Sequence, residues 1–481
     1  MREAVAPTKT RATEGSARVP PSCGEWLRTY GHQLGLRVIE STVDPMQFQA
    51  TAYLEHLEHE VADPPPVLFS SPTALAGGRS DFRLLFNAFA ALRSLNLVLG
   101  AAASSWPGLL DDFVRRVSEV ARPQITEEPA PVHTNIVKGE SLDLAVLPWV
   151  RHVAHDGGPY FTPIVVACDS ISGRYNLSWN RAMYLDRNHL AIHISPRHLW
   201  SCQRAAEERD EALPVALVLG HHPAFNLAAA ALTTTEDDEY EAATSLLGGE
   251  LRLSASVSFG ADLLVPSDAE VVIEGRLLPR QRTVEGPFGE YLLYLGPQKL
   301  SHVVEVDALT YRDAPVVVEI FASHRDHLNA HIAIEASIFH KVRTTIPQVT
   351  AVSWFRGGGP TTLVLSINKS SEGQPMRAAL AAMAASNIVK QVIVVDDDVD
   401  IEDSHEVLWA VSTRVSAEED ITVLKNLQRN LLDPSQAGSR TTSGLIIDAT
   451  VPLSADFPPV ARVPRDALDR FPMESFDVRT P

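Results

Sequence analysis

Two glutamates that flank a Gly-Pro-Phe-Gly segment are the first residues of this sequence that could do chemistry. The stretch TVEGPFGEYLLYLG spans residues 283–296 and carries Glu285 and Glu290. Pro287 lacks a backbone N–H and the two glycines permit unusual backbone angles, so the segment predicts a shaped loop instead of a helix. Such a loop can turn both carboxylates toward one point, where like charges raise the pKa of one carboxyl and suit it to general acid catalysis. Two solvated glutamates on a turn are the alternative interpretation.

A second set of polar residues lies in the segment YNLSWNRAMYLDRNHLAIHISPRHLW, residues 175–200. Asn176, Ser178 and Arg181 precede an apolar strand pattern, and His198 follows a proline. Arg181 could bind a carboxylate through two parallel N–H groups, and an asparagine oxygen with a histidine nitrogen could ligate a divalent ion. Polar residues at the edge of a loop are the alternative.

An acidic run opens the segment TTTEDDEYEAATSLLGG, residues 233–249. Glu236, Asp237 and Asp238 suit the first turn of a helix, because the helix dipole favours anions there. One acid of this run could supply an oxygen ligand to magnesium or manganese. The spacing does not select which one.

Other motifs carry weaker signals. His324, His327 and His331 include an HxxxH spacing but lack the glutamate of a zinc protease motif. The segment DDDVDIED, residues 396–403, lacks the glycine and the closing glutamate of a calcium loop, which favours a solvated loop at a strand end. The sequence has no GxSxG motif and no P-loop, so it gives no support to a serine hydrolase or an ATPase of those types.

The composition indicates a globular protein whose partners are small molecules. The chain has 41 basic and 60 acidic residues, a net charge of −19, which argues against nucleic acid or an anionic membrane as the main partner. Its three cysteines lie far apart without a CxxC pair, so neither a disulfide framework nor a zinc site is indicated. We find no long apolar run and no signal-peptide pattern, and we therefore expect a cytoplasmic protein.

Element patterns divide the chain into regions of different character and predict a mixed α/β fold. Residues 1–22 are polar and rich in proline, which predicts a disordered tail. Residues 23–125 alternate helical and strand patterns, and residues 126–335 are mostly short β-branched strands that suggest a split β-barrel. Residues 336–481 contain a strand–helix–strand run, which is typical of a βαβ unit and a parallel sheet.

Four motifs, in the same order along the chain, resemble the UbiD-like family of decarboxylases that use prenylated FMN. They are NLSWNR from Asn176, EVVIEGRLLPRQRTVEGPFGEY, KQVIVVDDDVD from Lys390, and LWAVSTR. The resemblance is clear from about residue 125 to about residue 450. It implies the α/β regions described above, with prenylated FMN bound in the central region and oligomerisation through the C-terminal one.

The resemblance implies roles for three residues in catalysis. Arg181, Glu285 and Glu290 match the family's Arg-Glu-Glu network. Arg181 would bind the carboxylate of the substrate and anchor Glu285, and Glu290 would donate the proton. Apolar candidates for the pocket wall are Phe288, Tyr291, Leu292 and Leu328, which do not identify a substrate.

It also implies ligands for the cofactor and its ions. Asn176, His198 and Glu239 match ligands of manganese, or magnesium, which ties the flavin phosphate to the protein. Glu239 is chosen because the family ligand lies nine residues before a glycine, here Gly248, and Glu241 is the alternative. The expected cofactor-binding residues are Asn176, Ser178, Arg181, His198 and Lys390, the last as a phosphate-binding lysine. Potassium is a further family ion, bound largely by backbone oxygens. Thr244 and Arg197 depart from common family patterns near this site, which makes the metal ligands harder to match to the family's sequence positions.

The function that the resemblance implies is reversible non-oxidative decarboxylation of an α,β-unsaturated or aromatic acid. Loss of CO2 from an sp² carbon leaves a carbanion that side chains stabilise poorly, so a cofactor must accept the electrons. A flavin prenyltransferase would supply the cofactor, and a homodimer or larger oligomer is expected. The alternatives are a non-catalytic paralogue that acts as a binding or assembly partner, and a flavin-free metal-dependent hydrolase.

Overall fold

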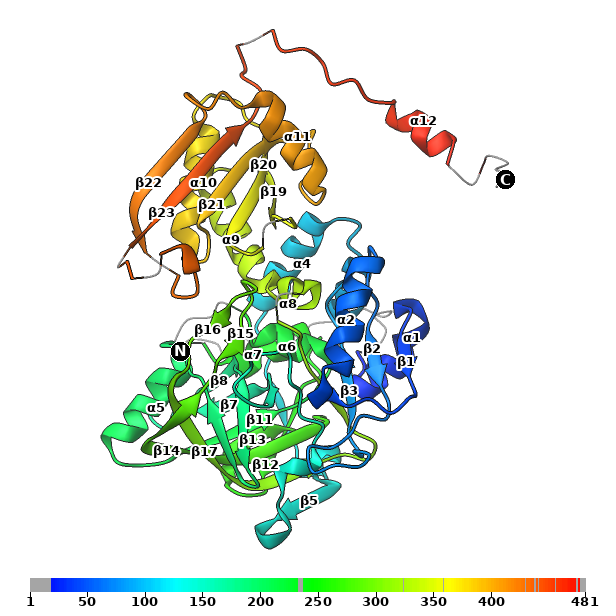
Figure 1. Cartoon of the computed structure of the whole chain (residues 1–481), viewed down its shortest axis with the longest axis vertical. Helices are drawn as coiled ribbons and strands as arrows, with labels where there is room; N and C mark the ends of the chain where they lie inside the picture. The colour runs from blue at the N-terminus through cyan, green and yellow to red at the C-terminus, as the bar shows by residue number, and fades with distance from the viewer. Residues whose placement is uncertain are drawn as a thin grey trace, which may run out of the picture.

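We describe the computed structural model of the chain over residues 19–475, except for residues 232–236, 323, 358, 429, 437, 440, 455, 473 and 474. Helices and sheets combine in successive regions of the chain (Figure 1), as the mixed α/β prediction requires. Most of the predicted N-terminal tail, residues 1–18, and Glu236 of the acidic run lie outside the described residues. No described helix is long and apolar enough to cross a membrane.

The N-terminal region packs helices around a small sheet. Its elements are α1 (Cys23–Leu34), β1 (Arg37–Ile39), α2 (Gln49–Glu60), β2 (Val67–Phe69), β3 (Arg83–Phe86), α3 (Leu92–Leu99) and α4 (Trp106–Ser118). Ser22 begins α1, because its hydroxyl accepts a hydrogen bond from Glu25 N at 3.3 Å. The sheet has the order β1-β2-β3-β18, and its last strand, β18 (Val316–Val318), returns from the end of the central region to pair parallel with β3.

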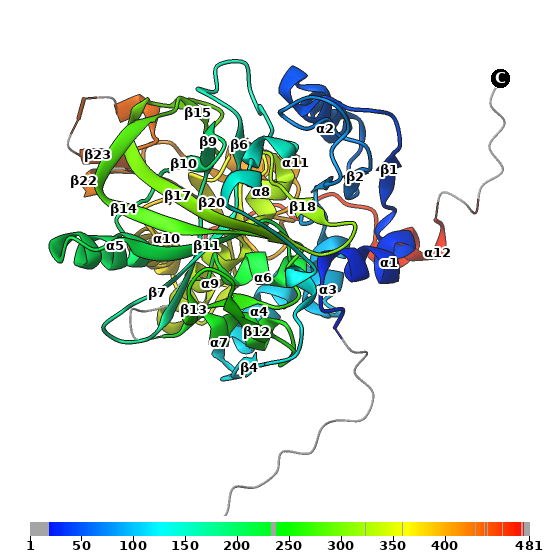
Figure 2. The ribbon, with the colours of Figure 1, turned by 90° about the horizontal axis from the view of Figure 1, so that it is seen from below.

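The central region is built on a nine-stranded antiparallel sheet with the order β6-β9-β10-β17-β14-β11-β7-β8, to which β5 adds through β17. Its strands are β5 (Asn135–Lys138), β6 (Tyr160–Phe161), β7 (Ile164–Cys168), β8 (Tyr175–Trp179), β9 (Ala182–Asp186), β10 (His189–Ile192), β11 (Leu213–Val218), β14 (Val271–Glu285) and β17 (Lys299–Tyr311). The two longest strands, β14 and β17, curve across the whole sheet (Figure 2). The curled sheet carries the candidate site at one end of these strands.

Helices and a smaller sheet complete the central region. They are β4 (Gln124–Ile125), α5 (His198–Glu208), α6 (Pro223–Ala228), α7 (Glu239–Leu246), β12 (Arg252–Ser256), β13 (Gly260–Pro266), β15 (Phe288–Gly289) and β16 (Leu295–Gly296). Asp238 begins α7, since its carboxylate accepts a hydrogen bond from Tyr240 N at 3.0 Å. The acidic run therefore does open a helix, with Glu239 and Glu241 in its first turn.

The C-terminal region follows two helices that leave the central region. Its elements are α8 (Arg325–Ala330), α9 (Ile332–Thr345), β19 (Val349–Trp354), β20 (Thr362–Ile367), α10 (Gln374–Ala385), β21 (Gln391–Asp396), α11 (Ser404–Arg414), β22 (Ile421–Gln428), β23 (Thr441–Ala449) and α12 (Arg465–Arg470). The sheet has the order β19-β20-β21-β23-β22, with β20, β21 and β23 parallel. Helix α10 connects β20 to β21, as the predicted βαβ unit requires. After β23 the chain leaves the sheet and extends to α12 (Figure 1).

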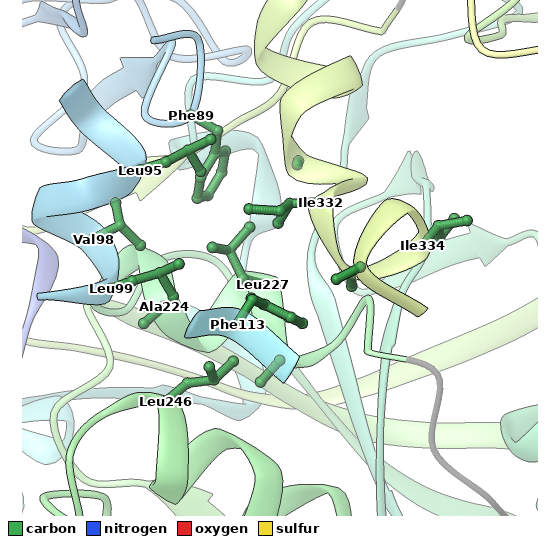
Figure 3. Close-up of a cluster of buried hydrophobic side chains, with 14 of the residues drawn as sticks. Phe89, Leu95, Val98, Leu99, Phe113, Ala224, Leu227, Leu246, Ile332 and Ile334 are labelled. Atoms are coloured by element: carbon green, nitrogen blue, oxygen red, sulfur yellow. The ribbon is translucent and has the colours of Figure 1, made fainter. Parts of the chain in front are cut away.

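A large apolar core joins helices from all three regions. Figure 3 shows side chains of α3, α4, α6, α7 and α9 meeting in one cluster. Its labelled members are Phe89, Leu95, Val98, Leu99, Phe113, Ala224, Leu227, Leu246, Ile332 and Ile334. In α3, Leu95, Val98 and Leu99 recur at the three- and four-residue spacing that places apolar groups on one helix face. This packing supports the sheet from behind the site.

Candidate active site

Arg181 and Glu285 form a buried, two-bond ion pair. Arg181 lies in the turn between β8 and β9, and Glu285 is the last residue of β14. Arg181 Nε lies 2.8 Å from Glu285 Oε1, and Nη2 lies 3.1 Å from Oε2. The carboxylate is fully buried and the arginine side chain is only 6% exposed. A bidentate pair of this kind fixes the orientation of the guanidinium plane.

Glu290 contacts the same guanidinium from the other side of the Gly-Pro-Phe-Gly segment. Arg181 Nη1 donates a hydrogen bond to Glu290 Oε1. The segment is the predicted shaped loop, with Gly286 at φ +88° and β15 paired to β16 beyond it. It also passes so close to Gly157 that an added Cβ there would collide with the backbone oxygen of Gly286. Both carboxylates therefore face one point, which is occupied by a cation.

The guanidinium of Arg181 gives Glu285 a different pKa from the one that the sequence suggests. Burial raises the pKa of Glu285, but the hydrogen bonds and charge of Arg181, with a hydrogen bond from Tyr160, outweigh it. The pKa of Glu285 therefore lies below its ordinary value. The expectation that like charges raise a pKa is wrong for this carboxyl, because Arg181 contacts both acids and compensates their repulsion.

Tyr160 holds the loop and the carboxylate together. Its hydroxyl donates to Glu285 Oε1 at 3.0 Å and accepts from Gly286 N at 3.0 Å. Ser301 Oγ donates to Glu285 Oε2 at 3.2 Å, so every oxygen of this buried carboxylate has more than one partner. Burial, and then the charge of Glu285, raise the pKa of Tyr160 far above its ordinary value. The sequence analysis missed Tyr160 because no local motif marks it.

Lys299 and His193 are a second pair that the sequence analysis missed. Lys299 Nζ lies 3.2 Å from His193 Nε2. His193 follows β10, where its N–H donates to Arg181 O, and Lys299 begins β17. Burial, followed by the charges of Arg181 and Lys299, lowers the pKa of His193 to about 4. The two residues are 106 positions apart, and only the strand register brings them together.

The predicted metal ligands converge from three elements. Asn176 in β8 donates from Nδ2 to Glu239 Oε2 at 2.8 Å, and His198 Nδ1 at the start of α5 lies 3.1 Å from Glu239 Oε1. Glu241, the alternative ligand, turns away and pairs with Arg122 at 3.5 Å. The geometry thus brings Glu239, and not Glu241, to Asn176 and His198.

These three residues fit a divalent ion. Asn176 Oδ1 is buried and has no hydrogen-bond partner among the described residues, although a buried amide oxygen normally has one. An amide oxygen, an imidazole nitrogen and a carboxylate are donors that manganese and magnesium accept. In the described part of the chain, no group of three or more His, Cys, Asp and Glu residues is placed to hold a metal, and this set contains only two such residues.

Two predicted cofactor residues, Ser178 and Lys390, have hydrogen-bond partners outside this cluster. Ser178 Oγ donates to Asn180 Oδ1 at 2.7 Å. Lys390, just before β21, pairs with Asp433 at 2.7 Å and donates to Ser435 Oγ at 2.6 Å. No hydrogen bond or ion pair between described residues joins Lys390 to the predicted metal ligands. Lys390 and Asp433 instead line a pocket of the C-terminal region.

The HxxxH histidines are packed into the protein next to Tyr291, which follows Glu290. Their rings lie 4.8 Å apart, and the ring of Tyr291 lies 6.1 Å from His327 and 5.9 Å from His331. Burial lowers the pKa of both, to about 4 for His331. His324 instead contacts Glu55 at 2.8 Å. His327 and His331 thus share Tyr291 as a neighbour, and His324 faces away to Glu55.

Comparisons with known proteins assign this chain to a family. The family model described as the 3-octaprenyl-4-hydroxybenzoate carboxy-lyase Rift-related domain matches residues 124–325, and the C-terminal domain of the same carboxy-lyase matches residues 327–449. Together they cover more than half of the chain. The chain therefore belongs to the UbiD family of carboxy-lyases.

Named relatives agree with this assignment. The chain is 33% identical to an anhydromevalonate phosphate decarboxylase of Methanothermobacter thermautotrophicus, over 68% of this chain and 79% of the relative. It is 30% identical to a phenolic acid decarboxylase of a Streptomyces species, over 79% of this chain and 82% of the relative.

A solved structure confirms the predicted fold class. The UbiD-class enzyme HmfF of Pelotomaculum thermopropionicum, in complex with FMN, superposes with a TM-score of 0.86 at 34% identity, over 95% of this chain and all of that one. An evolved dimeric form of HmfF in complex with prenylated FMN superposes with a TM-score of 0.82 at 34% identity, over 93% of this chain and 98% of that one.

Proposed function

We propose that this carboxy-lyase catalyses the reversible, non-oxidative decarboxylation of an α,β-unsaturated or aromatic acid with prenylated FMN as cofactor. The observation that carries the proposal is the single guanidinium of Arg181 in contact with both Glu285 and Glu290. FMN and prenylated FMN in the HmfF structures support the cofactor. The name of the phenolic acid decarboxylase supports an aromatic acid.

In this mechanism Arg181 orients the substrate acid and Glu290 donates the proton. Arg181 binds the substrate carboxylate, and Glu285, with its bonds from Tyr160 and Ser301, keeps the guanidinium plane fixed. The carbon–carbon bond breaks, CO2 leaves, and Glu290 donates a carboxyl proton to the carbon that carried it. The bound prenylated flavin supplies the electron sink for this step. In the reverse direction the Glu290 carboxylate accepts the proton.

The remaining polar residues would hold the cofactor. Asn176, His198 and Glu239 would ligate manganese or magnesium beside the flavin phosphate. Ser178 and Arg181 would contact the cofactor, and Lys390 would bind phosphate after exchanging its contact with Asp433. Potassium and a flavin prenyltransferase as cofactor supplier complete the proposal. No observation favours the flavin-free hydrolase or the non-catalytic paralogue.

The test is Glu290→Gln in protein co-expressed with a flavin prenyltransferase in the presence of manganese and potassium. We expect decarboxylation of a panel of cinnamates and phenolic acids to fall by at least about 100-fold, since general acid catalysis contributes on that order. Mass spectrometry should find prenylated FMN retained. Glu241→Gln, on the far side of α7 from Glu239, is the matched control and should keep activity. Full activity in Glu290→Gln would contradict the proton-donor role, and a wild type without flavin would contradict the reaction class.

A further inference from the structure

Lys299 projects into the candidate site from the strand next to Glu285. The two residues are direct partners in the antiparallel pairing of β14 and β17, and paired residues of neighbouring strands project to the same face. Ser301 lies two positions further along β17, on that same face, and its hydroxyl reaches Glu285. Strands β14, β17 and β10 run side by side (Figure 2). Lys299 therefore lies on the face that carries the Arg-Glu-Glu network.

The partner of Lys299 is a neutral imidazole. An ammonium group has only donors, so His193 Nε2 must accept the hydrogen bond at 3.2 Å and the ring proton must lie on Nδ1. Burial and the neighbouring cations lower the pKa of His193, in agreement with a neutral ring. His193 consequently positions the Lys299 ammonium without neutralising its charge.

Lys299 lacks the direct carboxylate contacts that Arg181 has. Arg181 bonds two carboxylates, whereas Lys299 forms no ion pair with a carboxylate of the described residues. Burial, and then the charge of Arg181, lower the pKa of Lys299, and the charges of Glu290 and Glu285 oppose this only in part. A half-buried ammonium that is not directly bonded to a carboxylate gains a charge-assisted hydrogen bond when an anion binds to it. Two of its three donors remain beyond the one that His193 accepts.

We propose that Lys299, held by His193, forms an anion subsite beside Arg181 that binds a carboxylate group of the substrate acid. The inference rests on the proposed function and deepens it, because it assigns a second cation to the same site. Arg181 keeps its bonds to Glu285 and binds the substrate carboxylate as proposed above, and Lys299 adds a second positive charge beside it. The subsite selects acids over neutral compounds of the same shape.

The test compares acids with their amides in protein saturated with unprenylated FMN, so that the acids are not consumed. The probes are benzoate with benzamide and cinnamate with cinnamamide, measured by calorimetry in wild type, Lys299→Met and Lys299→Gln. We expect both variants to bind the two acids roughly 10- to 100-fold more weakly, as loss of a charged hydrogen bond predicts, and to bind the amides unchanged. Lys299→Arg should keep most of the preference. Lys138→Met is the matched control, since Lys138 is exposed and pairs with Ala308 toward the other end of β17.

Every other outcome would count against either the Lys299 subsite or the proposed function. Unchanged acid binding in both charge-removing variants would overturn the subsite, as would a wild type that does not prefer acids to amides. Equal losses for acids and amides would also overturn it, because they would assign Lys299 a role in pocket shape instead of charge. FMN binding by the wild type is measured before any probe is added. Failure to bind FMN would count against the proposed function.

Discussion

One arginine determines how the two catalytic carboxylates of the proposed mechanism behave. Arg181 uses three of its donors on Glu285 and Glu290, so two acids that would repel each other stay close together in a buried place. Glu285 is held by four hydrogen bonds and has a lowered pKa, which suits an anchor that stays ionised. Glu285 is anchored and Glu290 is less buried. Because both are glutamates, this difference comes from their hydrogen-bond partners.

At this scale Tyr160→Phe tests the anchor. Removing the hydroxyl takes one donor from Glu285 and leaves Gly286 N without its acceptor. We expect kcat to fall about 10-fold or more, since a hydrogen bond to a charged group contributes about 1.5–3 kcal/mol. Flavin content should not change. Tyr53→Phe on α2, which removes a hydroxyl that accepts a hydrogen bond from Arg37 of β1, is the control. Unaltered kcat in Tyr160→Phe would show that Arg181 and Ser301 hold Glu285 without Tyr160.

Lys390→Ala tests the proposed phosphate contact. We expect the purified variant to lose flavin on gel filtration while the wild type keeps it, because a charge-assisted contact to phosphate is removed. Asp433→Asn frees the lysine from its ion pair and should retain flavin at least as well as the wild type. Lys425→Ala, on the exposed face of β22, is the control. Equal flavin occupancy in Lys390→Ala and wild type would contradict the contact.

At the scale of elements, the turn between β11 and α6 buries two neutral histidines. Burial lowers the pKa of His221 to about 4 and that of His222 to about 3. His222 also begins α6, because its Nδ1 accepts a hydrogen bond from Ala224 N at 3.2 Å. An imidazole that accepts this bond while fully buried must stay unprotonated. Protonation of His222 at low pH would therefore break the hydrogen bond that begins α6.

His222→Asn tests this sensitivity. His222 binds a proton near the ordinary histidine pKa of 6.5 in the unfolded chain, but only near pH 3 in the folded chain. The wild type therefore loses stability as pH falls from 6.5 toward about 3. The slope per histidine is roughly 1.4 kcal/mol per pH unit. Asparagine keeps a cap for α6 and removes the titration, so urea unfolding should show a shallower slope between about pH 6 and pH 4. The exposed His405→Asn is the control, and equal slopes in the two variants would contradict the prediction.

At the scale of the whole molecule, two hydrogen-bonded contacts stand out among those that connect the C-terminal region to the rest. The buried Glu335 of α9 accepts hydrogen bonds from Trp106 Nε1 at 2.5 Å and Trp354 N at 3.1 Å, and so ties α4 to β19. Asn430, after β22, donates to the Tyr291 hydroxyl at 2.6 Å. Tyr291 follows Glu290 directly, so the second contact links the C-terminal region to the loop that carries the proposed proton donor.

The Asn430–Tyr291 contact is testable with a double-mutant cycle. Asn430→Ala and Tyr291→Phe should each lower kcat/KM several-fold, because either change frees the loop. The double variant should lose little more than one single variant, with a coupling of about 0.5–1.5 kcal/mol. Asn387→Ala, in the same C-terminal pocket, is the control. Additive losses would show that the two residues act independently of each other.

The sequence by itself determined the mixed α/β class and the family, because both depend on patterns that are local in the chain. Periodicity distinguishes helix from strand within a dozen residues, and the motifs around Asn176, Glu285 and Lys390 are contiguous. Although they did not mark Tyr160, His193 or Lys299, these motifs named Asn176, Arg181, Glu285 and Glu290. Their catalytic and ligand roles stay predictions until the variants are measured.

Only the tertiary structure decided which partners those residues have. The roles of Tyr160, His193 and Lys299 depend on register between strands that are distant in sequence, and no local pattern records that register. Glu239 meets Asn176 and His198 while Glu241 does not, because residues two apart on a helix point to nearly opposite sides. The lowered pKa of Glu285 likewise depends on an arginine 104 positions away, brought to it by the folded sheet.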